Sequence, residues 1–312
     1  MTKNILYALF ALLLTTASCK KTSPKTDETV EVVSAEKKAP FFKISLAQWS
    51  LHKAIRNEKT LDPIGFAEKA KELGFEGIEY VSGLYNEKLK TMSMDALLDS
   101  LKAKSTAHGV KNVLIMVDGE GNLASTDEKE RNQAIDNHKK WVDAAAFLGC
   151  HAIRVNLNGA TEKDAWIESS VKGLGKLAEY GATKNINVIV ENHGGFSSNA
   201  DLLSEVMTKI NMDNCGTLPD FGNFRISKDE LYDYYKGTEI LMKHAKAVSA
   251  KSYDFDTDGN ETTLDYTRLL QIVKDAGYTG YIGVEYEGSR LSEEEGIEAT
   301  KQLLINAAKK LN

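Results

Sequence analysis

Three apolar stretches of this sequence each end in a carboxylate. They are residues 186–190 before Glu191, residues 215–219 before Asp220, and residues 281–284 before Glu285. A carboxylate on a buried strand is costly unless it is paired, hydrogen-bonded or bound to a metal. Because the same cost recurs in three units, we expect Glu191, Asp220 and Glu285 to share one site. Hard oxygen ligands of this kind suit Mg²⁺ or Mn²⁺.

A histidine accompanies the first of these carboxylates. His193 lies two residues after Glu191, so both side chains point the same way if the strand continues. Gly194 and Gly195 follow it and permit a close approach of backbone or ligand. An imidazole added to the carboxylates would also suit Mn²⁺, Co²⁺ or Zn²⁺.

The elements that position these residues follow a repeat. An amphipathic helix ends at a glycine, as at Leu73-Gly74 or Leu148-Gly149, and an apolar strand follows a few residues later. The predicted strands are residues 44–49, 76–81, 112–117, 152–157, 187–192, 215–220, 247–252 and 281–286. Strands alternating with helices indicate a parallel sheet.

Eight such units predict a single (β/α)8 TIM barrel over residues 41–312. The alternative is a doubly wound open sheet, which would normally carry a glycine-rich phosphate loop after a strand, and the sequence has no such motif. The active site of a barrel lies at the carboxyl ends of its strands, where the three carboxylates fall.

Four motifs resemble those of the xylose-isomerase-like TIM barrels, described as sugar phosphate isomerases/epimerases. The resemblance covers roughly residues 43–310, and its motifs are Val190–Gly194, Asp220–Asn223, Val248–Lys251 and Gly283–Tyr286. It implies that Glu191, Asp220 and Glu285 bind a divalent metal. It also implies that Glu191 and Glu285 move a proton at a sugar carbon beside a carbonyl.

Two positions depart from the family pattern. Ser249 stands where a metal-ligating histidine is usual, two residues before Lys251, and Asn223 stands where many members have a substrate-contacting histidine. Either the metal has fewer protein ligands, or His193 completes its shell, or this branch has no metal.

Further substrate-binding candidates lie at other strand ends, and each has a structural alternative. Lys251 either binds a substrate oxygen or pairs with Glu285. Glu79 and Arg154 either contact substrate or form a salt bridge inside the barrel. Trp49 either stacks on a sugar ring or packs in the core.

The resemblance implies a sugar isomerase or epimerase that transfers a proton at the carbon alpha to a carbonyl, through an enediolate. A lyase or dehydratase on the same site, and a non-catalytic carbohydrate-binding barrel, are the alternatives. The net charge of −6 argues against a nucleic-acid partner. The expected partner is a small carbohydrate, and the oligomeric state stays open.

The N-terminus predicts export. Lys3 precedes an apolar run, Ile5–Leu14, and small residues then precede Cys19, as in a bacterial lipobox. We expect residues 1–18 to be a lipoprotein signal peptide, Cys19 to be lipidated, and residues 19–40 to form a flexible tether. The protein would then lie in the cell envelope and meet the membrane only through its lipid. An ordinary signal peptide or a membrane anchor is the alternative.

Overall fold

The computed structural model describes residues 39–311. The expected signal peptide, Cys19 and nearly all of the tether lie outside the described residues, so these stay predictions. Within residues 39–311, no helix is long and apolar enough to cross a membrane.

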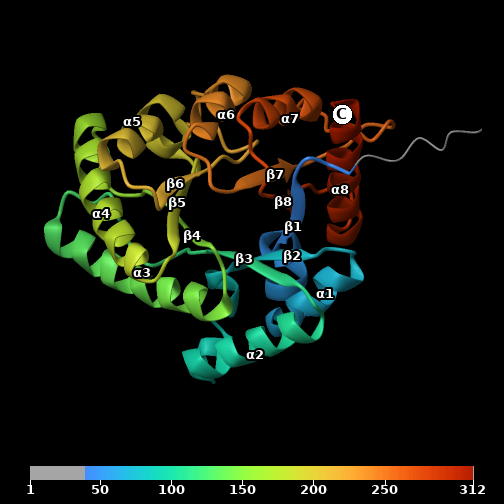
Figure 1. The fold of residues 1–312 in the computed structure, drawn as a ribbon, viewed down its shortest axis with the longest axis horizontal. Helices are drawn as coiled ribbons and strands as arrows, with labels where there is room; N and C mark the ends of the chain where they lie inside the picture. Colours follow the sequence, from blue (N-terminus) through green and yellow to red (C-terminus); the bar gives the residue numbers. More distant parts are fainter. Residues whose placement is uncertain (1–38, 312) are drawn as a thin grey trace, which may run out of the picture. The chain divides into compact units, whose positions relative to one another are not determined.

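Eight parallel strands form one sheet that curls around a common centre (Figure 1). They are β1 (Lys43–Ala47), β2 (Gly77–Val81), β3 (Lys111–Met116), β4 (Ala152–Val155), β5 (Asn187–Glu191), β6 (Cys215–Leu218), β7 (Val248–Ser252) and β8 (Tyr281–Tyr286). Their order in the sheet is β6-β5-β4-β3-β2-β1-β8-β7. Every predicted strand is present within a few residues of its expected bounds, and the (β/α)8 barrel is confirmed.

The sheet is bridged between β6 and β7 by isolated pairs rather than by a regular ladder. Thr217 pairs with Ala245, and Asp220 pairs with Ser249. Pro219 has no N–H to donate, but its carbonyl accepts from the Ser249 N–H at 2.9 Å. This irregular closure places Asp220 directly beside Ser249.

The helices lie outside the strands (Figure 1). They are α1 (Phe66–Glu72), α2 (Met94–Ala107), α3 (Glu128–Leu148), α4 (Lys163–Thr183), α5 (Ala200–Ile210), α6 (Tyr234–Met242), α7 (Tyr266–Asp275) and α8 (Glu293–Lys310). Short helical turns follow several strands, among them η1 (Gln48–Leu51), η2 (Lys53–Asn57), η3 (Pro63–Gly65), η4 (Ser82–Tyr85), η5 (Lys88–Lys90) and η6 (Gly195–Ser198). The expected glycine at the end of a helix is present at α3, where Gly149 adopts φ 75° directly after the helix.

Apolar side chains of the strands and helices form the core between the two layers. Ile78, Leu114, Ile153 and Val188 are fully buried there. Burying a side chain of this size contributes about 1.5–3 kcal/mol. The interior of the barrel differs, because it holds charged residues, and these form the site described next.

Candidate active site

The three strand-end carboxylates meet inside the barrel. Glu191 is the last residue of β5, Asp220 follows β6, and Glu285 lies in β8. An oxygen from each lies within 4.8 Å of the others, and all three residues are buried. Oxygens bound to one small divalent ion lie about 2.1 Å from it, hence up to about 4.2 Å apart. The spacing therefore fits a shared cation after small side-chain shifts.

Glu191 is held by two neighbours and keeps one oxygen free of hydrogen bonds. Its Oε1 accepts from Asn223 Nδ2 at 2.9 Å. Its Oε2 lies 2.9 Å from Arg154 Nε as an ion pair. That pair is poorly aligned, so Oε2 accepts no hydrogen bond from the described residues. Arg154 therefore balances the charge of this oxygen, whose remaining lone pair is available to a ligand.

Ser249 lies between the other two carboxylates. Its Oγ is 2.7 Å from Asp220 Oδ2 and 3.0 Å from Glu285 Oε2. A hydroxyl carries one hydrogen and can donate to only one of them at a time. The second contact needs a proton on one carboxyl group, or a cation between the two. Burial, opposed by Lys251 but reinforced by Glu191 and Glu285, holds the pKa of Asp220 well above its ordinary value.

Lys251 of β7 is a buried cation within the acidic cluster. Its Nζ lies 2.7 Å from Glu285 Oε1, 3.0 Å from Glu287 Oε1 and 3.9 Å from Asp220 Oδ2. Burial alone would lower the pKa of Lys251, but these carboxylates outweigh it and keep the pKa well above its usual range. Burial would likewise raise the pKa of Glu285, yet the ammonium of Lys251 holds that pKa below its ordinary value. The expected pairing of Lys251 with Glu285 is present.

Arg154 of β4 joins Glu191 to the adjacent strand end. Its Nη1 lies 2.8 Å from Asp118 Oδ1, and Asn156 Nδ2 donates to the same oxygen at 3.0 Å. Burial opposes ionisation of Asp118, but the guanidinium outweighs burial and lowers the pKa of that carboxyl. Arg154 is therefore fixed by an acid on each side and fixes Glu191 in turn.

Glu79 does not form the ion pair with Arg154 that the sequence suggested as one alternative. Within the described chain its partner is Ser45, whose Oγ donates to Oε1 at 2.6 Å, while Oε2 has no hydrogen bond. Gly283 leaves room for this carboxyl, because a Cβ there would lie 2.6 Å from Oε2. Burial, only partly offset by the Ser45 hydroxyl, raises the pKa of Glu79 to about 8. Because no cation pairs with Glu79 in the described chain, burial favours the neutral acid form of this residue near pH 7.

A cavity of about 500 Å³ opens beside the carboxylates at the ends of β5, β6 and β7. Its lining residues are His193, Gly194, Gly222, Asn223, Arg225, Leu231, Tyr234 and Tyr253. Asn223 connects it to Glu191. His193 is exposed here and is not one of the three clustered residues, so its role as a metal ligand stays a prediction.

Sequence reasoning did not select Tyr253, Tyr234 or Arg225 for this cavity. A signal existed for Tyr253, because it lies two residues after Lys251 and strand alternation turns both to the same side. Arg225 and Tyr234 lie in the connection after β6 and at the start of α6, where no periodicity marks them.

Trp49 lies in η1, directly after β1. Its ring is half-buried and stacks on His52, with 4.6 Å between the ring centroids. The Arg56 guanidinium lies 5.7 Å from the same ring centroid. Trp49 therefore belongs to the rim of the barrel mouth rather than to its charged centre, and its contact with a sugar stays a prediction.

The family of this chain follows from comparison with known proteins. The model of the xylose isomerase-like TIM barrel family matches residues 67–307. The chain belongs to that family.

One curated relative and two solved structures show which known proteins this chain is similar to. The C-glycoside deglycosidase alpha subunit of Arthrobacter globiformis is 35% identical over 65 residues, which are 20% of this chain and 18% of the relative. The IOLI protein, solved with a binding zinc atom, superposes with a TM-score of 0.65 at 19% identity, over 86% of this chain and 99% of that one. The 3-keto-D-glucoside 4-epimerase YcjR of E. coli superposes with a TM-score of 0.63 at 16% identity, over 84% and 98% of the two chains.

Proposed function

We propose that this protein is a sugar isomerase or epimerase that moves a proton at the carbon alpha to a carbonyl. The observation that carries the proposal is the buried cluster of Glu191, Asp220 and Glu285, whose oxygens lie within 4.8 Å of one another. Epimerisation needs a base and an acid on either side of one carbon, and two glutamates on separate strands supply both. The similarity to a 3-keto-D-glucoside 4-epimerase supports a carbohydrate substrate.

The surrounding residues prepare the two glutamates for this role. Lys251 keeps Glu285 ionised, as a proton acceptor must be. Arg154 and Asn223 hold Glu191 from two sides. Burial of the cluster strengthens these electrostatic contacts, because little water screens them.

The cluster also fits a divalent cation, which we propose as the cofactor. Glu191, Asp220 and Glu285 would hold it, and the convergence of their oxygens and the shared Ser249 hydroxyl are the observations that favour this. When bound, such an ion stabilises negative charge that develops on a substrate oxygen. Three carboxylates without the expected histidine favour Mg²⁺ or Mn²⁺ over Zn²⁺ or Co²⁺.

A lyase on the same site is the second candidate. The short match to a C-glycoside deglycosidase alpha subunit is the observation that favours it. Loss of the proton alpha to a carbonyl would then be followed by departure of a beta substituent instead of return of the proton. Both candidates share the first proton removal and differ only in the product.

Solvent exchange tests that shared step. Ketoses and 3-keto glycosides are incubated with the metal-supplemented protein in ²H₂O, and NMR follows loss of the alpha proton and formation of product. We expect Glu191→Gln and Glu285→Gln each to slow exchange by about 10²- to 10⁴-fold. Glu239→Gln, which alters an exposed glutamate of α6, is the control.

Full turnover in both glutamine variants would rule out the two-glutamate mechanism. If no sugar exchanges a proton while carbohydrates still bind, the protein is a carbohydrate-binding barrel instead.

We further propose a lipid-anchored location in the cell envelope. Cys19 after small residues is the feature that supports it. In a bacterial host, Cys19→Ser should abolish incorporation of labelled palmitate and release the protein from the membrane fraction. Equal labelling of both forms would contradict the proposal.

A further inference from the structure

A second cavity, of about 610 Å³, lies on the rim of the barrel. We call it the rim cavity; its lining residues are Ile55, Arg56, Lys59, Leu61, Asp62, Pro63, Gly83, Leu84, Asn86, Glu87 and Lys88. All of them lie in the segments that follow β1 and β2. The rim cavity therefore opens at the same end of the barrel as the carboxylate cluster, and Arg56 connects it to Trp49.

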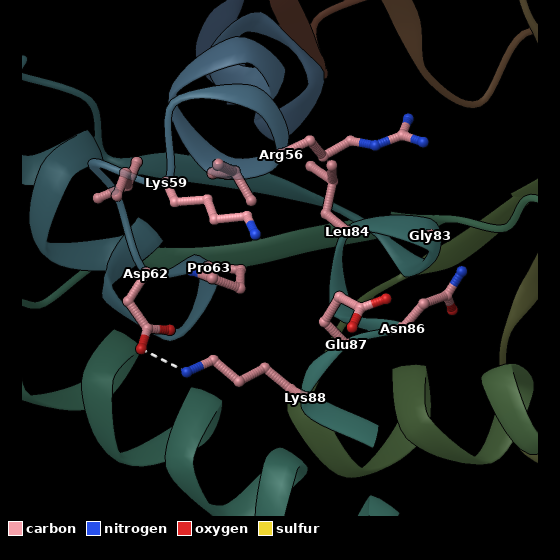
Figure 2. A pocket seen from close by; sticks show the side chains of 11 residues that line it. Arg56, Lys59, Asp62, Pro63, Gly83, Leu84, Asn86, Glu87 and Lys88 are labelled. Atoms are coloured by element: carbon pink, nitrogen blue, oxygen red, sulfur yellow. Dashed lines mark hydrogen bonds and ion pairs between the residues drawn. The ribbon is translucent and has the colours of Figure 1, made fainter. Parts of the chain in front are cut away.

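The charges of the rim cavity leave two cations unmatched. Asp62 pairs with Lys88 at 2.5 Å, and Glu87 pairs with Lys90 outside the cavity at 2.6 Å. Arg56 and Lys59 have no carboxylate within ion-pair distance among residues 39–311, although Lys90 and, to a lesser extent, Lys59 lower the pKa of the Glu87 carboxyl. Figure 2 shows the Lys59 ammonium pointing into the cavity, with Arg56 extended along its margin.

The backbone that presents these cations is unusual. Arg56 lies in η2, a single π-helical turn, a rare element that is frequent at functional sites. Lys59 ends this segment in the left-handed region, at φ 55°, where a residue other than glycine is disfavoured. The Thr60 N–H closes the turn on the Ala54 carbonyl at 2.9 Å. A lysine at a position that suits glycine suggests that its side chain has a use there.

We propose that the rim cavity binds an acidic sugar unit, one that bears a carboxylate or a sulfate group. The oxyanion would lie against the Lys59 ammonium, which points into the cavity, while the Arg56 guanidinium at the margin would add positive charge. The C–H face of the ring would lie against the apolar side chains of Ile55, Leu61 and Leu84. This inference rests on the proposed function. If both hold, the substrate is a glycoside that carries an acidic unit next to the reacting sugar.

Direct binding tests the rim cavity independently of catalysis. Calorimetric titration of the full chain with D-glucuronate, D-glucose 6-sulfate, D-glucose and inorganic sulfate separates the carboxylate, the sulfate ester, the ring and the anion. We expect one or both acidic sugars to bind at least about tenfold more tightly than glucose or inorganic sulfate, and less tightly as salt rises.

Two variants locate the binding. Lys59→Gly should weaken binding of the acidic sugar by about tenfold, and Arg56→Gln should weaken it by a smaller factor. Lys59→Gly removes the charge and also relieves the left-handed backbone, so loss of fold is not a concern. Lys129→Gln, at an exposed lysine of α3, is the charge-matched control and should change nothing. The Glu191→Gln/Glu285→Gln double variant should keep the binding.

The outcomes separate this inference from the proposed function. Equal binding of glucose and the acidic sugars, or binding insensitive to both rim variants, would overturn the rim cavity as an acidic-sugar site. Loss of binding only in the double glutamine variant would place the ligand in the barrel centre and overturn it as well. Rim binding without any proton exchange would leave this inference standing while the isomerase proposal fell.

Discussion

At the scale of single residues, the main feature of the protein is a set of charged side chains that contact one another inside the barrel. Lys251 and Arg154 each hold one of the two glutamates. Ser249 stands between Asp220 and Glu285, where the family resemblance led us to expect a histidine. The serine hydroxyl supplies a hydrogen bond to the acids but is a poor metal ligand beside an imidazole.

This difference predicts a change in metal preference. Ser249→His would add an imidazole next to Asp220 and Glu285 and should raise affinity for Zn²⁺ relative to Mg²⁺ by at least about tenfold. Competition of each metal against a chelating dye measures this without any activity assay. Ser249→Ala, which adds no ligand, is the control and should leave the ratio near that of the wild type. A folded Ser249→His protein with the wild-type ratio would show that a side chain at this position does not reach the bound metal.

At the scale of elements, the repeat of helix, glycine and strand could be predicted from the sequence, because each unit follows local sequence patterns. Gly149 ends α3 in the left-handed region, and the strand β4 begins three residues later, as the pattern predicted. The irregular junction of β6 with β7 was not predicted from the sequence. Pro219 interrupts the ladder of hydrogen bonds there, and only isolated pairs remain. The turn η2 and the left-handed Lys59 were also missed, because a π-helical turn has no sequence period of its own.

At the scale of the whole molecule, burial of one carboxyl couples stability to pH. The folded protein holds a proton on Glu79 up to about pH 8, whereas an unfolded glutamate loses it near its ordinary pKa of 4.5. Between these values the folded state binds more protons than the unfolded state. Stability is therefore highest at low pH, as far as this group is concerned, and falls as pH rises toward 8.

Glu79→Gln should remove this dependence, because glutamine stays neutral. In the metal-free protein, the free energy of unfolding of the wild type should fall relative to that of the variant by up to about 1.4 kcal/mol per pH unit between roughly pH 5 and 8. Urea unfolding of both proteins across that range measures the difference. Parallel curves for wild type and variant would show that Glu79 is already ionised in the folded state.

The sequence by itself determined the barrel, its eight strands and the strand ends at which the chemistry lies. It did so because alternation, helix periodicity and glycine stops are local properties that each segment carries alone. Only the tertiary structure decided the partners: Glu79 with Ser45 instead of Arg154, Arg154 between Asp118 and Glu191, and the unmatched cations of the rim cavity. Partner choice inside a barrel depends on side-chain directions and distances across strands far apart in sequence, and no local pattern encodes these.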